Sequence, residues 1–150
     1  MISSLRPIAL TLVMVVLAAC ALVSVPVDHA RATAQDVYTM LNQYRVSQGK
    51  PALVRIPAID TIAQNWTTQM VRTNKLAHNP GYSRQYPAGW RLAGENVGYG
   101  GSALVVHNAL VASPGHRANM LDSRFNAVGI GFVNGPDGRV WVTQNFARYD

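Results

Sequence analysis

Apolar side chains recur at helical spacing in two stretches that follow residue 35. The first is residues 36–48, which Gly49 ends, and the second is residues 57–74, which opens with Pro57 at a permitted first-turn position. The positions that fit one helical face are Val37, Met40, Leu41 and Tyr44 in the first stretch and Ile59, Ile62, Ala63, Trp66 and Met70 in the second. We therefore predict two helices, joined by an extended segment at residues 52–56, that each bury one face.

The second half of the chain alternates between strand and helix patterns. We predict a short strand at residues 95–99, a helix capped by Ser102 that runs to residue 112 and is buried on a broad face, and a helix that starts after Ser113. Residues 126–133 and 139–147 then form a hairpin, in which glycines at 129 and 131 leave one face free for close packing. This order predicts an α+β domain: a mixed, mostly antiparallel sheet with helices on its faces.

Residues 75–93 show no periodicity, and turn residues interrupt them. Tyr82, Tyr86 and Trp90 are spaced along this segment. Such a long connection is typical of functional or mobile loops. Two interpretations stay open: the aromatic side chains line a binding groove, or they cover the core beneath the loop.

The N-terminus has the pattern of an export signal, with one cation in residues 1–6 and an almost wholly apolar run at residues 7–27. Small residues at 30, 32 and 34 predict cleavage after Ala32 or Ala34. Two alternatives remain: residues 17–20 resemble a lipobox, which would lipidate Cys20, and the apolar run is long enough for an uncleaved anchor. All three place a domain of residues 35–150 outside the cytoplasm, in the extracellular space or the cell envelope, and confine membrane contact to the N-terminal segment or a lipid on Cys20.

Composition narrows the function classes. Cys20 is the single cysteine of the chain, so residues 35–150 contain no disulfide and depend on their core for stability. The 13 Lys and Arg against 7 Asp and Glu give a net charge of +6, but these cations are scattered. Without a basic run that could follow a phosphate backbone, we expect no nucleic-acid partner. A mildly cationic surface favours anionic envelope polymers or lipids.

Candidate chemistry centres on His78, Glu95 and His116. With Ser113 as N-cap and Pro114 at N1, His116 is the N3 residue, where the helix dipole favours a neutral imidazole that can bind a metal or accept a proton. The Ser113 hydroxyl is expected to point to the His116 backbone N–H, which makes it a poor nucleophile. His107 lacks a polar neighbour at i+3 or i+4 that could orient a metal ligand, so we assign it no site role.

Five blocks in order resemble the CAP superfamily, also called SCP-like, over nearly all of residues 35–150. The blocks are Leu41-Asn42-Gln43-Tyr44-Arg45, Ala77-His78-Asn79, Gly94-Glu95-Asn96-Val97, residues 113–121 (SPGHRANML) and residues 128–132 (VGIGF). The resemblance implies an α-β-α sandwich with a central cleft, in which two histidines and two glutamates bind a divalent metal such as zinc in some members.

By motif, His78 and His116 correspond to the two family histidines and Glu95 to the first glutamate. The second glutamate is missing, because Glu95 is the only glutamate in the chain; His107, Asn108 and Ser113 lie near its expected place. The family's common disulfides are also missing, as is the tryptophan often found before the Ser113 turn, where Leu110 stands.

Two functions follow as hypotheses. The first is a binding or interaction module whose cleft takes a lipid, a sterol-like molecule or another cell-envelope ligand, as the resemblance implies for some members. The second is a metal-assisted hydrolase, with His78, Glu95 and His116 holding zinc or another divalent cation and Glu95 as ligand or catalytic base. The missing carboxylate weakens an acid/base pair more than it weakens a binding cleft.

Overall fold

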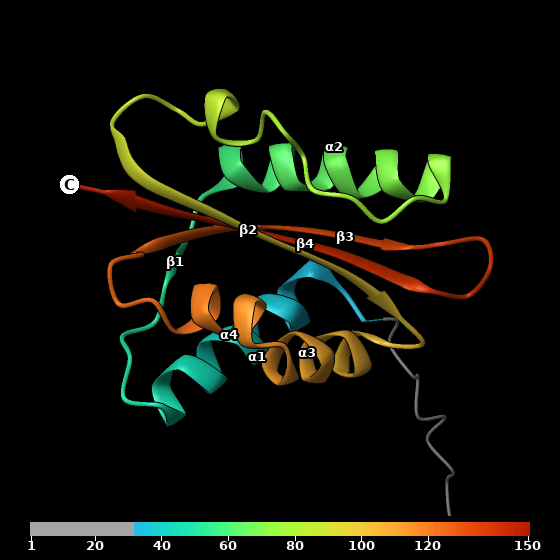
Figure 1. Cartoon of the computed structure of the whole chain (residues 1–150), viewed down its shortest axis with the longest axis horizontal. Helices are drawn as coiled ribbons and strands as arrows, with labels where there is room; N and C mark the ends of the chain where they lie inside the picture. Colours follow the sequence, from blue (N-terminus) through green and yellow to red (C-terminus); the bar gives the residue numbers. More distant parts are fainter. Residues whose placement is uncertain (1–31) are drawn as a thin grey trace, which may run out of the picture.

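A four-stranded sheet lies between two layers of helices in the computed structural model, which describes residues 32–150. The helix α2 covers one face, and α1, α3 and α4 cover the other (Figure 1). The predicted α+β sandwich is thus confirmed. The elements in chain order are α1 (Ala34–Ser47), β1 (Val54–Arg55), α2 (Pro57–Thr73), the 3-10 helix η1 (Ser83–Gln85), β2 (Trp90–Gly100), α3 (Ala103–Ala112), α4 (Pro114–Leu121), β3 (Ala127–Asn134) and β4 (Val140–Tyr149).

The strand order in the sheet is β1-β3-β4-β2. The two-residue β1 runs parallel to β3, whereas the β3–β4 hairpin and the β4–β2 pair are antiparallel. The sheet is therefore mixed and mostly antiparallel, as predicted. This order leaves the eleven-residue β2 at one edge of the sheet.

The glycines of β3 set how closely α2 approaches the sheet. A Cβ atom at Gly129 would overlap the backbone of α2 at Ile59 and Asp60, and one at Gly131 would overlap the backbone of Ala63. Any side chain at either position would push the helix away. The close packing predicted from the alternating glycines is confirmed, and α2 is the element that uses it.

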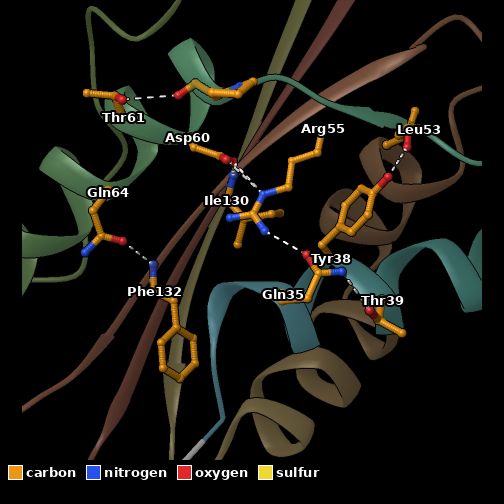
Figure 2. Close-up of polar contacts among 11 residues, drawn as sticks. Gln35, Tyr38, Thr39, Leu53, Arg55, Asp60, Thr61, Gln64, Ile130 and Phe132 are labelled. Carbon is orange, nitrogen blue, oxygen red and sulfur yellow. Dashed lines mark hydrogen bonds and ion pairs between the residues drawn. The ribbon is translucent and has the colours of Figure 1, made fainter.

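Side chains of α2 also cap the free edge of β3 (Figure 2). Beyond the two residues paired with β1, the Ile130 N–H donates to Asp60 Oδ1 at 2.7 Å and the Phe132 N–H donates to Gln64 Oε1 at 2.9 Å. Asp60 also pairs with Arg55 at 2.9 Å. Edge donors that are satisfied in this way cannot recruit another strand, so the edge is protected against aggregation.

The opposite face carries the larger core and one buried cation. Arg45 has no exposed surface; it donates from Nε to the Pro51 carbonyl and from Nη1 to the carbonyls of Met120 and Asp122, where α4 ends. A guanidinium at a helix C-terminus satisfies carbonyls that have no partner within the helix and complements its dipole. The hydrophobic residues buried around it include Val37, Leu41, Leu53, Val106, Leu110, Met120, Phe125, Val128, Ile130, Val142 and Phe146.

Two sequence predictions need correction. The strand expected at residues 95–99 begins at Trp90, because Leu92 and Ala93 also pair with β4, so the irregular segment ends earlier than residue 93. The helix α3 is not buried on a broad face: Ala103, Val106 and Leu110 are buried, whereas Leu104 and Val105 are 58% and 53% exposed. Because almost all residues of α3 are apolar, the sequence does not distinguish the side that faces solvent from the buried side.

Thr33 caps the first helix of the described residues. Its hydroxyl accepts from the Asp36 N–H and the Asp36 carboxylate accepts from the Thr33 N–H, a complete capping box for α1. Within residues 32–150, no helix combines the length and apolar character that crossing a bilayer requires. The apolar run, the lipobox and the anchor of the N-terminal predictions fall on residues 1–31, outside the described part of the chain. Ala32 and Ala34 are described, and Ala34 is the first residue of α1. Cleavage after either of them stays a prediction.

Candidate functional site

Strand β2 sends its side chains alternately to the two helical layers. A Cβ at Gly98 would contact Val106 and Leu110 of α3, and Asn96 donates to the carbonyl of His116. The positions between them face the other way, and Val97 packs in a cluster with Met70 of α2. Glu95 therefore lies on the α2 side of the edge strand, where the segment after α2 passes.

His78 and Glu95 form a hydrogen-bonded pair. Glu95 Oε1 lies 2.8 Å from His78 Nδ1 and accepts the backbone N–H of Asn79 at 2.9 Å. Because an ionised carboxylate only accepts hydrogen bonds, His78 Nδ1 is the donor to Oε1, and Nε2 is the other ring nitrogen of this tautomer. The imidazole is 62% exposed, whereas the carboxylate side chain is 1% exposed. The buried carboxylate therefore holds the solvent-exposed imidazole in a fixed orientation.

Burial and hydrogen bonding act in opposite directions on Glu95. Burial raises the pKa of its carboxyl group, while the Asn79 N–H and the His78 imidazole lower it. The net shift is upward, since desolvation is the largest of these effects. A carboxylate in such surroundings holds its neighbours more firmly than an exposed one.

His116 comes from the other layer, at the start of α4. Burial lowers the pKa of its imidazole, and the nearby His78 adds to the decrease. The predicted neutral histidine is thus supported, although burial is the principal cause. Asn96 fixes its position by donating Nδ2 to the His116 carbonyl at 3.0 Å, and Asn119 donates to Asn96 Oδ1 at 2.9 Å.

Sequence reasoning missed these two asparagines as positioning residues. Asn96 is fully buried, and Asn119 also donates to the Glu95 carbonyl at 3.3 Å, so the two join β2 to α4. Both lie inside the quoted motif blocks, beside Glu95 and three residues after His116. An amide side chain inside the same motif block as a candidate ligand was the signal that could have found them.

The prediction for Ser113 is confirmed for its N-cap position and wrong for its hydroxyl group. Ser113 occupies the N-cap position of α4, but its side chain makes no capping hydrogen bond, and its carbonyl accepts the Arg117 N–H instead. Its backbone has φ −83° and ψ 119°, while Pro114 supplies no N–H at N1. The helix start therefore depends on proline and on the backbone of Ser113.

A groove of about 410 Å³ lies beside His116 at the free edge of β2, with walls from α3, from the start of α4 and from Leu76 in the segment after α2. Leu76, next to the His78 segment, and Tyr99 are both 43% exposed at its margin. Ala109 is an exposed residue of its wall. The lining is mostly apolar and consists of Leu76, Val97, Gly98, Tyr99, Val106, Ala109, Leu110, Ser113 and His116.

The structure brings two of the three predicted site residues into contact and places the third nearby. His78 and Glu95 are hydrogen-bonded, and the charge of His78 contributes, after burial, to the lowered pKa of His116. Within residues 32–150, no three His, Cys, Asp or Glu side chains form a group that could hold a metal ion. The three-residue metal set therefore stays a prediction.

The chemistry of the donors suits a different division of roles. A metal-binding histidine usually donates its other ring N–H to a carboxylate, which is the relation of His78 to Glu95. Glu95 Oε1 is already committed to two donors, so His78 Nε2 and His116 are the imidazole nitrogens that could face an ion. In that arrangement Glu95 orients a ligand.

The remaining candidates have other surroundings. His107 is partly buried edge-on against Tyr44, with ring centroids 6.0 Å apart, and burial lowers its pKa. Tyr82, Tyr86 and Trp90 form a series of edge-to-face contacts, in which Tyr86 is 6% exposed and donates to the Phe146 carbonyl. These aromatic residues cover the core, which favours the second interpretation of the segment at residues 75–93.

Comparison with known proteins gives one family match and several solved structures of similar fold. A family model described as the cysteine-rich secretory protein family (CAP) matches residues 38–146. An outer surface protein of Borrelia burgdorferi aligns with a TM-score of 0.71 at 15% identity, covering 77% of this chain and 92% of that one. Comparison with curated proteins returns no match.

Two further solved structures are similar. An extracellular protein containing an SCP domain from Bacillus anthracis has a TM-score of 0.67 at 26% identity; the alignment covers 76% of this chain and 39% of the larger one. Venom allergen-like protein 4 of Schistosoma mansoni has a TM-score of 0.61 at 11% identity, with 79% and 90% covered. Because these sequence identities are low, the structural similarity supports the fold and no further property.

Proposed function

Since the chain belongs to the cysteine-rich secretory protein (CAP) family, we propose that it is an exported binding module whose groove between β2 and α3–α4 takes an apolar cell-envelope ligand. A lipid or a sterol-like molecule is the class that such a lining suits. The similar bacterial proteins are described as an outer surface protein and an extracellular protein, which supports an exported location.

One observation carries this proposal: the lining of the groove is mostly apolar and includes one imidazole, that of His116. Small-molecule sites combine a mostly hydrophobic lining with a few polar groups that fix orientation. His116 supplies such a polar group, and exposed His78 is a second one nearby. A hydroxyl or carboxylate head group would bind at the histidines while its hydrocarbon part lies against Val97, Tyr99 and Leu110.

Blocking the groove tests the proposal. Ala109 is exposed in the groove wall, so Ala109→Trp fills the space without disturbing the core. Titration with the fluorescent fatty acid cis-parinaric acid should show binding to the wild type and at least about tenfold weaker binding to the variant, a loss of about 1.4 kcal/mol.

Ala118→Trp is the matched control, because Ala118 is an exposed alanine of α4 outside the groove lining. It should bind the probe as the wild type does. Equal binding by Ala109→Trp and the wild type would contradict the proposed site, and so would equal weakening by both tryptophans.

A metal-assisted hydrolase is the second candidate, and the His78–Glu95 pair favours it. Zinc, when bound, supplies a Lewis acid and a more acidic water. His78 and His116 would hold the ion, and Glu95 would keep the His78 Nδ1–H in place. With few protein ligands, we expect weak affinity and strong competition from water.

Calorimetric zinc titration of the wild type and of His116→Ala separates the two functions when a hydrolase substrate screen follows. Zinc-dependent turnover that His116→Ala abolishes would establish the enzyme. Binding of the fatty-acid probe without turnover would establish the module.

A further inference from the structure

Behind the exposed His78–Glu95 pair, three buried polar atoms have no partner among residues 32–150. They are Glu95 Oε2 and both side-chain polar atoms, Nδ2 and Oδ1, of Asn145 on β4. The Glu95 side chain is 1% exposed, and Asn145 has no exposed surface. Leaving a buried amide or carboxylate oxygen without a hydrogen bond is costly, so native structures nearly always supply a partner.

The sheet register places these atoms next to one another. Glu95 of β2 is directly opposite Asn145 of β4, so both side chains lie on the α2 face. The carbonyls of Asn126 and Val128 bond to β1, so Gly129 directs its N–H and C=O to Asn145. Asn145 in turn directs its backbone toward β3, and Glu95–Asn145 is a closely spaced pair without backbone hydrogen bonds. In such pairs the Cα atoms are about 4.5 Å apart and the side chains are at their closest.

Small residues lie beside this pair in the sheet, on the same face and toward β3 and the end of β4. Gly129 continues its row on β3, and the adjacent row consists of Ala93, Ala147 and Ala127. Thr143, the neighbour on the other side along β4, is committed to Thr67 at 2.8 Å. The neighbouring side chains therefore leave Asn145 and Glu95 without a direct partner while occupying little volume.

We propose that one buried water molecule bridges Glu95 and Asn145. A carboxamide presents a donor and an acceptor side by side, so one water can accept from Asn145 Nδ2 and donate to Asn145 Oδ1. Its second hydrogen then goes to Glu95 Oε2. Three hydrogen bonds are the typical number for a buried water, and they account for all three atoms.

This water holds the Glu95 carboxylate on the side that faces away from solvent. Glu95 Oε1 is fixed by His78 and Asn79, and the water fixes Oε2, so the plane of the carboxylate is set from both ends. Asn145 thereby acts as a positioning residue for the imidazole of His78 through Glu95. The inference does not depend on which ligand the groove takes or on whether metal binds.

Two measurements on the folded wild-type chain test it. Water–protein NOE spectroscopy should give a long-lived water cross peak to the Asn145 side-chain amide, and an atomic-resolution crystal structure should show one water within about 2.7–3.2 Å of Glu95 Oε2 and the Asn145 amide. A direct Asn145 Nδ2–Glu95 Oε2 hydrogen bond, or an amide without a water cross peak, would overturn the proposal.

A matched pair of variants locates the signal. Asn145→Leu keeps approximate size but removes both polar atoms, so the water should lose its place beside Glu95 in the crystal structure. Thr143→Val alters a buried polar side chain two residues away on the same face and should retain the water and its NOE. Loss of the cross peak in Thr143→Val, or a water that stays at Glu95 in Asn145→Leu, would assign the bridge to other groups.

Discussion

Glu95 is a buried carboxylate contacted by two hydrogen-bond donors. It is the only glutamate in the chain, it is buried on an edge strand, and one of its oxygens accepts two hydrogen bonds. Burial disfavours its charge, while the Asn79 N–H and His78 favour it. The residue therefore links stability to the orientation of an exposed imidazole.

Replacing Glu95 by glutamine should lower the free energy of unfolding by about 1–2 kcal/mol, because a charge-assisted hydrogen bond to His78 becomes a neutral one. Among the histidines of residues 32–150, His78 alone is hydrogen-bonded to the Glu95 carboxylate, so the effect should come from this pair. Chemical denaturation of wild type, Glu95→Gln, His78→Ala and the double variant should give a coupling energy near 1 kcal/mol. Additive effects would show that the pair contributes nothing.

Because the His107 imidazole is partly buried, we expect the free energy of unfolding to depend on pH. Burial lowers the pKa of this imidazole in the folded state, so below about pH 6.5 the unfolded chain binds more protons than the folded one. Its contribution is present above that pH and is lost as pH falls through the lowered folded-state pKa. Tyr44 of α1 is the ring packed against it.

His107→Gln should therefore flatten the fall in unfolding free energy between about pH 7.5 and 5.5, as measured by urea denaturation across that range. His116 and the carboxyl groups supply the background slope in both proteins. An unchanged slope in the variant would contradict the assigned burial effect.

Among the elements, α2 packs especially closely on the sheet, because its backbone occupies the space that side chains at Gly129 and Gly131 of β3 would need. Gly131→Ala would press a methyl group against the Ala63 carbonyl and the Thr67 hydroxyl, neither of which can move without shifting the helix. We expect a loss of about 3 kcal/mol or more, at the upper end of overpacking costs.

Gly101→Ala is the control for this substitution, because a Cβ there meets nothing within 4 Å. Its unfolding free energy should stay within about 0.5 kcal/mol of the wild type. Thermal and urea melts of both variants provide the measurement. Equal stability of Gly131→Ala and Gly101→Ala would show that α2 does not pack as closely as described.

Elements with a strong local pattern could be predicted from the sequence. The stripes of α1 and α2, the proline starts and the β3–β4 hairpin follow from periodicity and turn residues. The beginning of β2 could not, because Trp90–Ala93 are a strand only through pairing with β4. The exposed side of α3 was equally hidden, since Leu104 and Val105 have the same apolar character as the buried positions.

Across the whole molecule, the candidate site draws on elements from all three layers. His78 follows α2, Glu95 lies on β2 and His116 begins α4, and β2 brings them to one edge of the sheet. The sequence motifs named these three residues, but long-range contacts decide their roles. Arg45, read from sequence as one of several scattered cations, proves to hold the end of α4.

Amide chemical-shift mapping with a fatty acid shows directly whether ligand binds in the groove beside His116. If the groove is the ligand-binding surface, the largest shifts fall on Gly98, Tyr99, Ala109 and His116. A second hollow of about 540 Å³ lies along α1, lined by Tyr38, Thr39, Asn42, Gln43, Val46 and Ser47. Shifts confined to that hollow, with Gly98 and His116 unmoved, would contradict the account.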